Sequence, residues 1–242
     1  MEEQIQEPQQ APMELAEAFA DLARLLLNEQ SLDATLQRIV DTAVKTVPGC
    51  DHAGISLIER RRSISTAAAS DEVPHAVDAI QYETSSGPCI DAIREHAAFF
   101  VDDLREEPRW PEFSARANEA TGVRSVLSLR LFAEEDTMGA LNLYSKEPHA
   151  FDEDAQAIGA VFAAHAAVAI SGGQREANLE KALESRDLIG QAKGILIANR
   201  QMTADEAFDA LRRASQHLNL KLRDVADRVI FTGEIPDRAE EH

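Results

Sequence analysis

The sequence contains little cysteine, few aromatic residues and no segment that resembles a secretion signal. Only two of its 242 residues are cysteine, Cys50 and Cys89, too few for a disulfide framework or a set of zinc ligands. The N-terminus is acidic and rich in glutamine, whereas a signal peptide begins with basic residues followed by an apolar core. No apolar run approaches the ~20 residues of a membrane-spanning helix. We therefore expect a cytoplasmic protein without a membrane segment, in a compartment that keeps its thiols reduced.

Catalytic and metal-binding motifs are missing as well. The seven histidines are scattered without the spacing of metal ligands. There is no P-loop, no Gly-rich nucleotide fingerprint and no Gly-x-Ser-x-Gly elbow. We therefore expect no metal site, no catalytic residues and no enzyme, and the sequence requires no cofactor. The acidic pairs Asp102-Asp103 and Glu106-Glu107 are interpreted as solvated loop charges. Trp110 fits a pocket lid or, as we favour, a surface anchor.

Positive charge is scarce except near the C-terminus. The whole chain has a net charge of −19, which repels nucleic acid phosphates. Residues 186–228 hold eight basic and six acidic residues, a net of +2, which leaves −21 for the remainder. An acidic body with a locally basic end suits a regulator that avoids indiscriminate binding to nucleic acid. A solvated helical surface of mixed charge gives the same count, so charge alone leaves both interpretations open.

The hydrophobic spacing of the first two thirds changes from helical to strand-like and back. Apolar residues at helical spacing predict one or two helices over 14–47, which Pro48-Gly49 ends. The order helix, two strands, helices, three strands and helix is an α+β pattern. The expected strands are 53–57, 64–69, 98–101, 126–131 and 138–143, and the expected helices between them are 72–82, 88–97 and 111–120.

The turn Ser86-Gly87-Pro88-Cys89-Ile90-Asp91-Ala92 combines a bend at Gly87 with a proline suited to the first position of a helix. Together with the pattern of elements, this turn resembles the GAF domain family over residues 14–170, with 1–13 as a disordered N-terminus. The resemblance implies an antiparallel sheet between helical layers that senses a small molecule or a redox signal. It also implies that Gly87, Pro88 and Cys89 lie at the mouth of the sensor pocket.

A long helical pattern connects this region to the C-terminal part of the chain. A helix is predicted from 152 to about 170, and Gly172-Gly173 is expected to interrupt it. Residues 171–184 then form a helical linker. A heptad frame across the interruption predicts a short coiled coil and a homodimer, although an ordinary connector fits about as well. The apolar residues in this frame are Ile158, Val161, Val168, Leu179, Ala182, Ile189 and Leu196.

Three further helices are predicted over about 186–200, from Thr203 onward and over about 221–231, which indicates a three-helix bundle. Thr203-Ala204-Asp205-Glu206 is a capping box that opens the second helix, and Gly233 follows the third. The bundle is expected to bury Phe208 and Phe231, which leaves no exposed aromatic residue on it.

Gly194 and Lys193 stand inside an otherwise apolar helical pattern. A glycine there costs about 1 kcal/mol against alanine, so the pair indicates a recognition surface. The pattern resembles the ANTAR family over residues 185–235, which leaves 236–242 as a tail. The residues that carry the resemblance are Ile189-Gly190-Gln191-Ala192-Lys193-Gly194-Ile195-Leu196, Asp205-Glu206-Ala207-Phe208, Leu211-Arg212, Ser215, Asn219-Leu220-Lys221-Leu222 and Asp224-Val225-Ala226.

ANTAR domains bind nascent RNA as dimers and stabilise paired hairpins, which prevents a transcription terminator from forming. The resemblance thus implies a signal-responsive antitermination regulator that meets the RNA polymerase complex only indirectly. Of the residues expected to bind RNA, two basic ones would contact loop phosphates. Two small ones would permit close approach, and three would lie around the last turn. These are Lys193 and Arg212, Ala192 and Gly194, and Ser215, Asn219 and Lys221, whereas Arg213, Arg223 and Arg228 are interpreted as solvated surface.

Two other functions remain open. A DNA-binding helix-turn-helix regulator would also have three short helices, but its recognition helix would need more basic residues than the region after Lys221 provides. A GAF-type cysteine redox sensor or methionine sulfoxide reductase would use Cys50 or Cys89. Free cysteines are most often buried, which favours a packing role for both. The helix N-terminus at Cys89 would nevertheless lower the pKa of its thiol.

Overall fold

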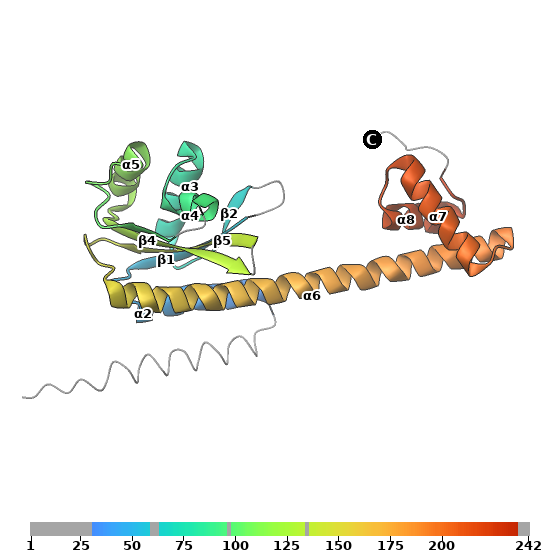
Figure 1. Ribbon diagram of the computed structural model, residues 1–242, viewed down its shortest axis with the longest axis horizontal. Helices are drawn as coiled ribbons and strands as arrows, with labels where there is room; N and C mark the ends of the chain where they lie inside the picture. Colours follow the sequence, from blue (N-terminus) through green and yellow to red (C-terminus); the bar gives the residue numbers. More distant parts are fainter. Residues whose placement is uncertain (1–30, 59–62, 96–97, 134–135, 237–242) are drawn as a thin grey trace, which may run out of the picture. The chain divides into compact units, whose positions relative to one another are not determined.

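The computed structural model describes residues 31–58, 63–95, 98–133 and 136–236, without the side chains of 133–138. It divides into two compact units, residues 1–173 and 174–242, which we describe separately. The expected disordered N-terminus, the first part of the predicted 14–47 helix and most of the 236–242 tail lie outside the described residues. The elements are α2 (Leu32–Thr46), β1 (His52–Ile58), β2 (Ile64–Ala69), α3 (Glu72–Thr84), α4 (Pro88–Glu95), β3 (Phe99–Val101), α5 (Pro111–Thr121), β4 (Ser125–Ala133), β5 (Asp136–Ser145), α6 (Glu153–Arg200), α7 (Ala204–Leu218) and α8 (Leu222–Thr232) (Figure 1).

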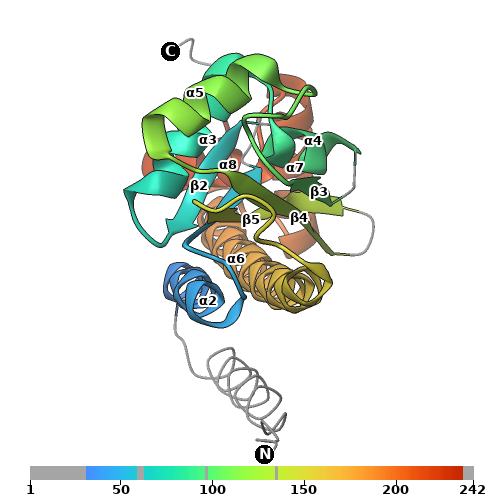
Figure 2. The ribbon, with the colours of Figure 1, turned by 90° about the vertical axis from the view of Figure 1, so that its left-hand side faces the viewer.

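The strands of the first unit form one antiparallel sheet in the order β2-β1-β5-β4-β3. The register of the central strands places Leu141 opposite both Ile55 and Leu129. α2 and the first part of α6 cover one face of the sheet, and α3, α4 and α5 lie on the other side (Figures 1 and 2). The α+β architecture expected from the sequence is therefore confirmed.

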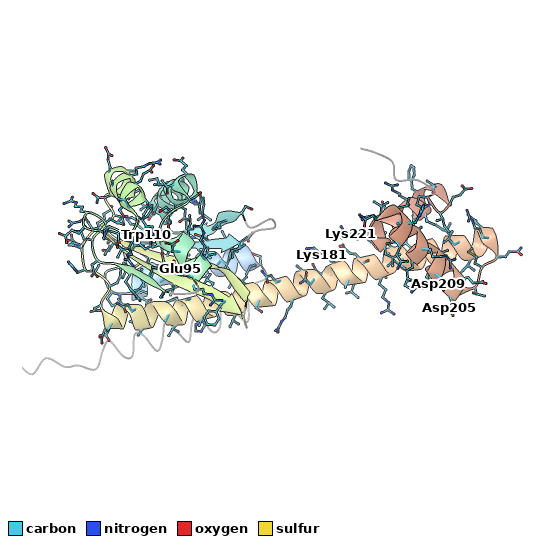
Figure 3. The ribbon with its side chains drawn as sticks, turned by 45° about the horizontal axis from the view of Figure 1, so that its top comes forward. Glu95, Trp110, Lys181, Asp205, Asp209 and Lys221 are labelled. Atoms are coloured by element: carbon cyan, nitrogen blue, oxygen red, sulfur yellow. The ribbon has the colours of Figure 1, made fainter. Side chains whose placement is uncertain are left out.

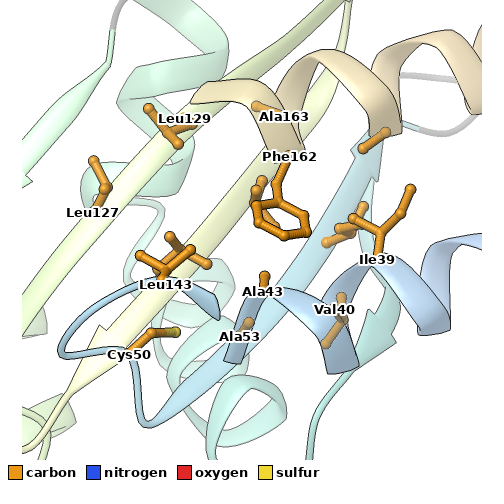
Figure 4. Packing of buried hydrophobic residues seen from close by; sticks show 14 of the residues in the cluster. Ile39, Val40, Ala43, Cys50, Ala53, Leu127, Leu129, Leu143, Phe162 and Ala163 are labelled. Carbon is orange, nitrogen blue, oxygen red and sulfur yellow. The ribbon is translucent and has the colours of Figure 1, made fainter. Parts of the chain in front are cut away.

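The main core lies where α2 and α6 meet the sheet. Phe162 of α6 is fully buried and shares this core with Ile39 and Val40 of α2 and Leu143 of β5 (Figure 4). The buried residues of α2 recur at the three- and four-residue spacing that places side chains on one helix face. The spacing of apolar residues in α2 therefore predicts the face that packs against the sheet.

One part of α6 is apolar enough to cross a membrane by length and composition alone, contrary to the expectation that no run approaches such a span. In the 18-residue window that meets this test, 39% is buried inside the protein. Phe162, Ala166 and Ile170 are all buried in the core of the first unit. Packing against the sheet therefore accounts for much of the apolar character of this segment.

α6 runs through Gly172-Gly173 without a break, so the expected interruption is wrong. A Cβ added at Gly173 would lie 3.1 Å from Cδ2 of Leu32 at the start of α2, which is a tight contact. Nothing lies within 4 Å of a Cβ added at Gly172. Gly173 therefore permits close packing of α2, and the helix continues because its backbone hydrogen bonds do not depend on the side chain.

Of the four acidic residues in the loop before α5, Asp102 and Glu106 are exposed as expected, whereas the side chains of Asp103 and Glu107 are removed from water. Asp103 is only 8% exposed, and its carboxylate accepts from Nε of Arg124 at 2.8 Å and also pairs with Nη2. Oε1 of Glu107 accepts from Nε of Arg109 at 2.7 Å. Asp103 and Glu107 thus each have an arginine partner, which offsets the cost of removing their charges from water.

Trp110 is buried, at 4% exposure, so its interpretation as a surface anchor is wrong. Its indole Nε1 donates to Oδ2 of Asp91 at 2.6 Å, and its ring meets that of Phe99 edge to face with centroids 5.6 Å apart. Trp110 therefore packs as part of the second core of the first unit, between α5 and the sheet.

The second unit packs α7, α8 and the last part of α6 around small and branched residues. The capping box is confirmed, because Oγ1 of Thr203 accepts from the Glu206 amide at 3.3 Å while the Thr203 amide donates to Oε2 of Glu206 at 2.8 Å. Gly233 ends α8 in the left-handed region, with φ of +78°. The fully buried core residues are Ala192, Leu196, Ala207, Leu211, Val225, Ala226 and Val229.

Phe208 and Phe231 are exposed, at 38% and 91%, which corrects the expectation that both are buried. The buried residues of α7 follow one stripe from Ala207 through Leu211 to Ala214. Phe208 follows Ala207 directly and so lies about 100° around the helix from it. Alanine, leucine and valine side chains fill the small core, and the larger aromatic side chain of Phe208 lies at the surface.

Candidate functional site

The expected sensor turn packs closely against the end of α3. Gly87 has φ of +140°, and a Cβ at this position would overlap the side chain of Gln81. Oε1 of the same glutamine accepts from the backbone N–H of Cys89 at 2.9 Å. Pro88 opens α4 as expected, and Pro88 and Cys89 are buried. The turn is thus held by one buried amide side chain.

Both cysteines are buried, which confirms the packing interpretation. Burial raises the pKa of Cys89 to about 12, so the expectation that its helix N-terminus lowers this pKa is wrong. Burial likewise raises the pKa of Cys50 to about 12. Since the thiolate is the nucleophile in cysteine chemistry, neither residue resembles a reactive thiol.

A buried carboxylate that the sequence analysis did not single out lies beside this turn. Asp78 of α3 is 1% exposed and accepts hydrogen bonds from five side chains on four elements. Burial raises the pKa of this carboxyl group. The donors are Ser56 Oγ at 2.8 Å, Thr66 Oγ1 at 2.7 Å, and Gln81 Nε2, Tyr82 Oη and Tyr144 Oη, each at 3.3 Å. Asp78 shares a helix face with Pro74 and Gln81, which are buried, but its donors on the sheet cannot be read from the sequence of α3.

The Asp78 network continues into the sheet. Nδ2 of Asn142 donates to Oγ of Ser56 at 3.1 Å, and Oγ of Ser128 donates to Oδ1 of Asn142 at 2.8 Å. Ser56, Ser128 and Asn142 are fully buried. The interior between the sheet and α3 is therefore polar and fully hydrogen-bonded at these groups. Within the described ranges, no group of three or more His, Cys, Asp or Glu is placed to hold a metal ion.

In the second unit the predicted residues of α6 divide between core and surface. Ala192 is fully buried in the bundle, so it cannot contact RNA in this conformation, which corrects the expectation of close approach there. Gly194 is exposed, and nothing lies within 4 Å of a Cβ added to it. Nζ of Lys193 lies 5.8 Å from the centroid of the Phe208 ring, within the range of a cation–π contact.

Arg212 and Ser215 follow Phe208 along one stripe of α7, at spacings of four and three residues. The Arg212 guanidinium is exposed and pairs with Asp209 at 2.9 Å. Oγ of Ser215 donates to the carbonyl of Leu220 at 2.7 Å, so this hydroxyl holds the turn after α7. The structure thus brings Lys193, Phe208 and Arg212 into one region.

Asn219 and Lys221 form the turn between α7 and α8. Asn219 ends α7 in the left-handed region, with φ of +51°, and Lys221 stands at the N-cap of α8. Both side chains are exposed, and Lys221 projects from the surface of the bundle (Figure 3). Asn219 therefore ends the helix in the left-handed conformation, a structural role that glycine commonly fills.

A second group of basic residues lines a shallow cavity of about 380 Å³ on another side of α7. Arg200, Arg213 and His217 line this cavity together with apolar residues such as Met202 and Ile235. Arg213 follows Arg212 in sequence and therefore points about 100° away from it around the helix. The two neighbouring arginines consequently lie on separate surfaces of one helix.

These features define a sensor-type α+β domain joined to a helical module with exposed cations. The family model described as GAF domain matches residues 29–171, and the model described as ANTAR domain matches residues 177–230. The chain therefore belongs to the GAF domain family and carries an ANTAR domain after the GAF domain. GAF is a signal-sensing domain and ANTAR an RNA-binding domain of antitermination regulators, so the chain combines sensor and RNA-binding classes.

No curated protein matches the chain, but solved structures resemble its first unit. The GAF domain of the Acinetobacter phosphoenolpyruvate-protein phosphotransferase has 16% identity and a TM-score of 0.54, covering 68% of this chain and 98% of that one. Its Coxiella burnetii counterpart has 14% identity and a TM-score of 0.56, covering 70% and 99%. The free methionine-R-sulfoxide reductase of Neisseria meningitidis has 15% identity and a TM-score of 0.54, covering 71% and 96%. At these identities the likeness shows the fold alone.

Proposed function

We propose that the protein is a cytoplasmic, signal-responsive antitermination regulator that binds paired hairpins in nascent RNA. The observation that supports this most directly is the ANTAR match over residues 177–230, together with exposed cations on its helices. Lys193, Arg212 and Lys221 lie at or near the surface of this domain, where they can reach phosphates. The GAF domain senses the signal, which is a small molecule or a redox change.

The signal acts on the hydrogen bonds around Asp78, in the interior of the domain, or on the turn between α3 and α4. Oxidation of Cys50 or Cys89 is the less favoured signal, because both thiols are buried and their pKa values are raised to about 12. The same raised pKa values argue against a cysteine-based reductase, despite the reductase among the structural neighbours. A bound small molecule that alters hydrogen bonds near the turn is the favoured input.

RNA binding is tested with a gel-shift assay on the full-length protein. A leader RNA with two hairpins, the same RNA with its loops replaced, and a duplex DNA of equal length are compared at one salt concentration, because salt changes all three affinities. We expect the two-hairpin RNA to bind more tightly than both controls. Tighter binding to the duplex would reject the proposal and favour the helix-turn-helix alternative.

The protein is a homodimer paired along α6, although not in the heptad frame that the sequence suggested. Leu196 is fully buried and Ile189 is partly buried against the bundle of the second unit, so both already have partners. Leu179 and Leu183, one turn apart, are 63% and 54% exposed and place two adjacent apolar side chains on one face of the helix. A second copy of this helix would remove both side chains from water.

Sedimentation of the full chain at tens of micromolar tests the dimer. The double variant Leu179→Glu, Leu183→Glu should sediment as a monomer. Lys181→Glu is the matched control, since it changes the net charge by the same amount on the other side of the helix, and it should remain a dimer. A monomeric parent protein, or a double variant that stays dimeric, would contradict pairing through these leucines.

A further inference from the structure

An aromatic side chain lies exposed at the centre of the candidate RNA surface. Phe208 is 38% exposed, whereas its neighbours Ala207 and Leu211 are fully buried in the bundle. Exposed phenylalanine is unfavourable in water, and the bundle core is already filled without this ring. The exposure of the Phe208 ring therefore costs free energy, and packing within the described bundle does not fully explain why a phenylalanine stands there.

The groups around Phe208 suit an unpaired nucleotide. Nζ of Lys193 lies 5.8 Å from the ring centroid. At this distance it can bind a phosphate and keep its cation–π contact with the ring. Arg212 lies one helical turn further along α7, pairs with Asp209 at 2.9 Å, and has a side chain that is 58% exposed. Gly194 leaves the helix surface next to Lys193 free of side chain. An apolar ring with one cation at its face and a second cation one helical turn away suits a base whose flanking phosphates bind the cations.

We propose that Phe208 stacks against an unpaired base of the RNA loop, while Lys193 binds the phosphate of that nucleotide. This inference rests on the proposed RNA-binding function and deepens it by naming the group that contacts the base. RNA loops display unstacked bases, and proteins commonly hold such bases on aromatic side chains. Phosphate contacts fix the position of a nucleic acid, whereas base contacts distinguish one loop from another.

Four variants of the full-length protein test the stacking contact in the gel-shift assay. Phe208→Ala should weaken binding of the two-hairpin RNA by about 10- to 100-fold, the range found for loss of one base–aromatic stack. Phe208→Tyr should bind as the parent does. Phe208→Leu retains apolar area without an aromatic face and should bind nearly as weakly as Phe208→Ala. Phe231→Ala, which removes the other exposed aromatic of the unit, should have no effect.

Fluorescence provides an independent readout. The chain contains one tryptophan, Trp110, which is buried in the first unit. Phe208→Trp adds a second tryptophan at the proposed contact, and stacking of a base should quench it on titration with RNA. The parent protein, titrated in parallel, corrects for any change at Trp110. An RNA in which the loop bases are replaced by abasic sites should bind more weakly and, at concentrations that saturate binding, should cause no quenching.

The outcomes separate the inference from the function on which it rests. If the parent protein does not bind the two-hairpin RNA, the proposed function fails and the inference fails with it. If the parent binds but Phe208→Ala and Phe208→Leu bind equally well, the inference alone is overturned. Circular dichroism of each variant establishes that the helical bundle is retained, and Phe208→Leu covers the case in which alanine unfolds it.

Discussion

The guanidinium of Arg124, the residue before β4, donates from Nε and Nη2 to the two carboxylate oxygens of Asp103. The backbone N–H of Arg105 also donates to Oδ1 of this carboxylate, at 3.0 Å. Only 7% of the Asp103 side chain is exposed, so water competes little for these contacts. The paired arginine lowers the pKa of Asp103 from 3.8 to about 2.

The stability of the first unit should therefore fall in acid through Asp103. A carboxyl group whose pKa is lower in the folded state stabilises the fold above its unfolded pKa, and this contribution is lost as the pH falls from about 4 to about 2. After allowance for solvent screening we expect about 1–2 kcal/mol. Urea unfolding followed by Trp110 fluorescence measures it. Asp103→Asn, which cannot ionise, should show a correspondingly smaller loss over the same pH range.

Removing the Asp78 carboxylate should destabilise the first unit strongly. Asp78→Ala leaves several buried donors without their acceptor, and we expect a loss of about 3 kcal/mol or more. Thr66→Val removes one donor only and should cost about 1 kcal/mol. Both are measured by urea unfolding with Trp110 fluorescence. Equal losses in the two variants would show that the network does not converge on Asp78.

The two adjacent glycines of α6 should respond differently to alanine. Gly172→Ala meets nothing within 4 Å and should stabilise the protein by about 1 kcal/mol through helix propensity. Gly173→Ala gains the same propensity but places its Cβ 3.1 Å from Leu32, so its net gain should be less than half as large. Thermal unfolding compares them. Leu32→Ala should abolish the difference, and a difference that persists would contradict this explanation.

Arg212 and Arg213 should differ in RNA binding although they are neighbours in sequence. Arg212→Ala should weaken binding and reduce the slope of log affinity against log salt by about 0.7, the value for one phosphate contact to a single strand. Arg213→Ala should leave affinity and slope unchanged. Both variants should keep their stability within about 0.5 kcal/mol. The reverse pattern would move the binding surface to the cavity that Arg213 lines.

The sequence predicted features whose causes are local. The capping box at Thr203 and the start of α4 at Pro88 depend on residues within one helical turn, and the structure has both. The strands of the sheet were recognised because alternating apolar and polar residues indicate a strand with one buried face. The α+β order followed from these local patterns, whereas the two family resemblances depended on the turn at Ser86–Ala92 and on motifs such as Ile189–Leu196.

Features that depend on distant partners were missed. Gly173 is explained by Leu32, at the other end of the first unit's sequence. Asp78 is explained by donors on β1, β2 and β5, which no pattern within α3 reveals. The exposure of Phe208 depends on which side of α7 meets its two neighbouring helices, and one residue of offset separates it from the buried stripe.

The convergence of several elements on Asp78 has a consequence for how the first unit opens. β2 is one of the two edge strands of the sheet, and edge strands ordinarily fray before the rest and offer their free backbone groups to other chains. Here Thr66 ties this edge to the same carboxylate that holds Tyr144 of the central strand β5. The amide hydrogens of β2 should therefore exchange with solvent in the same cooperative event as those of β5, and a signal that loosens the carboxylate would release the edge strand and the middle of the sheet together.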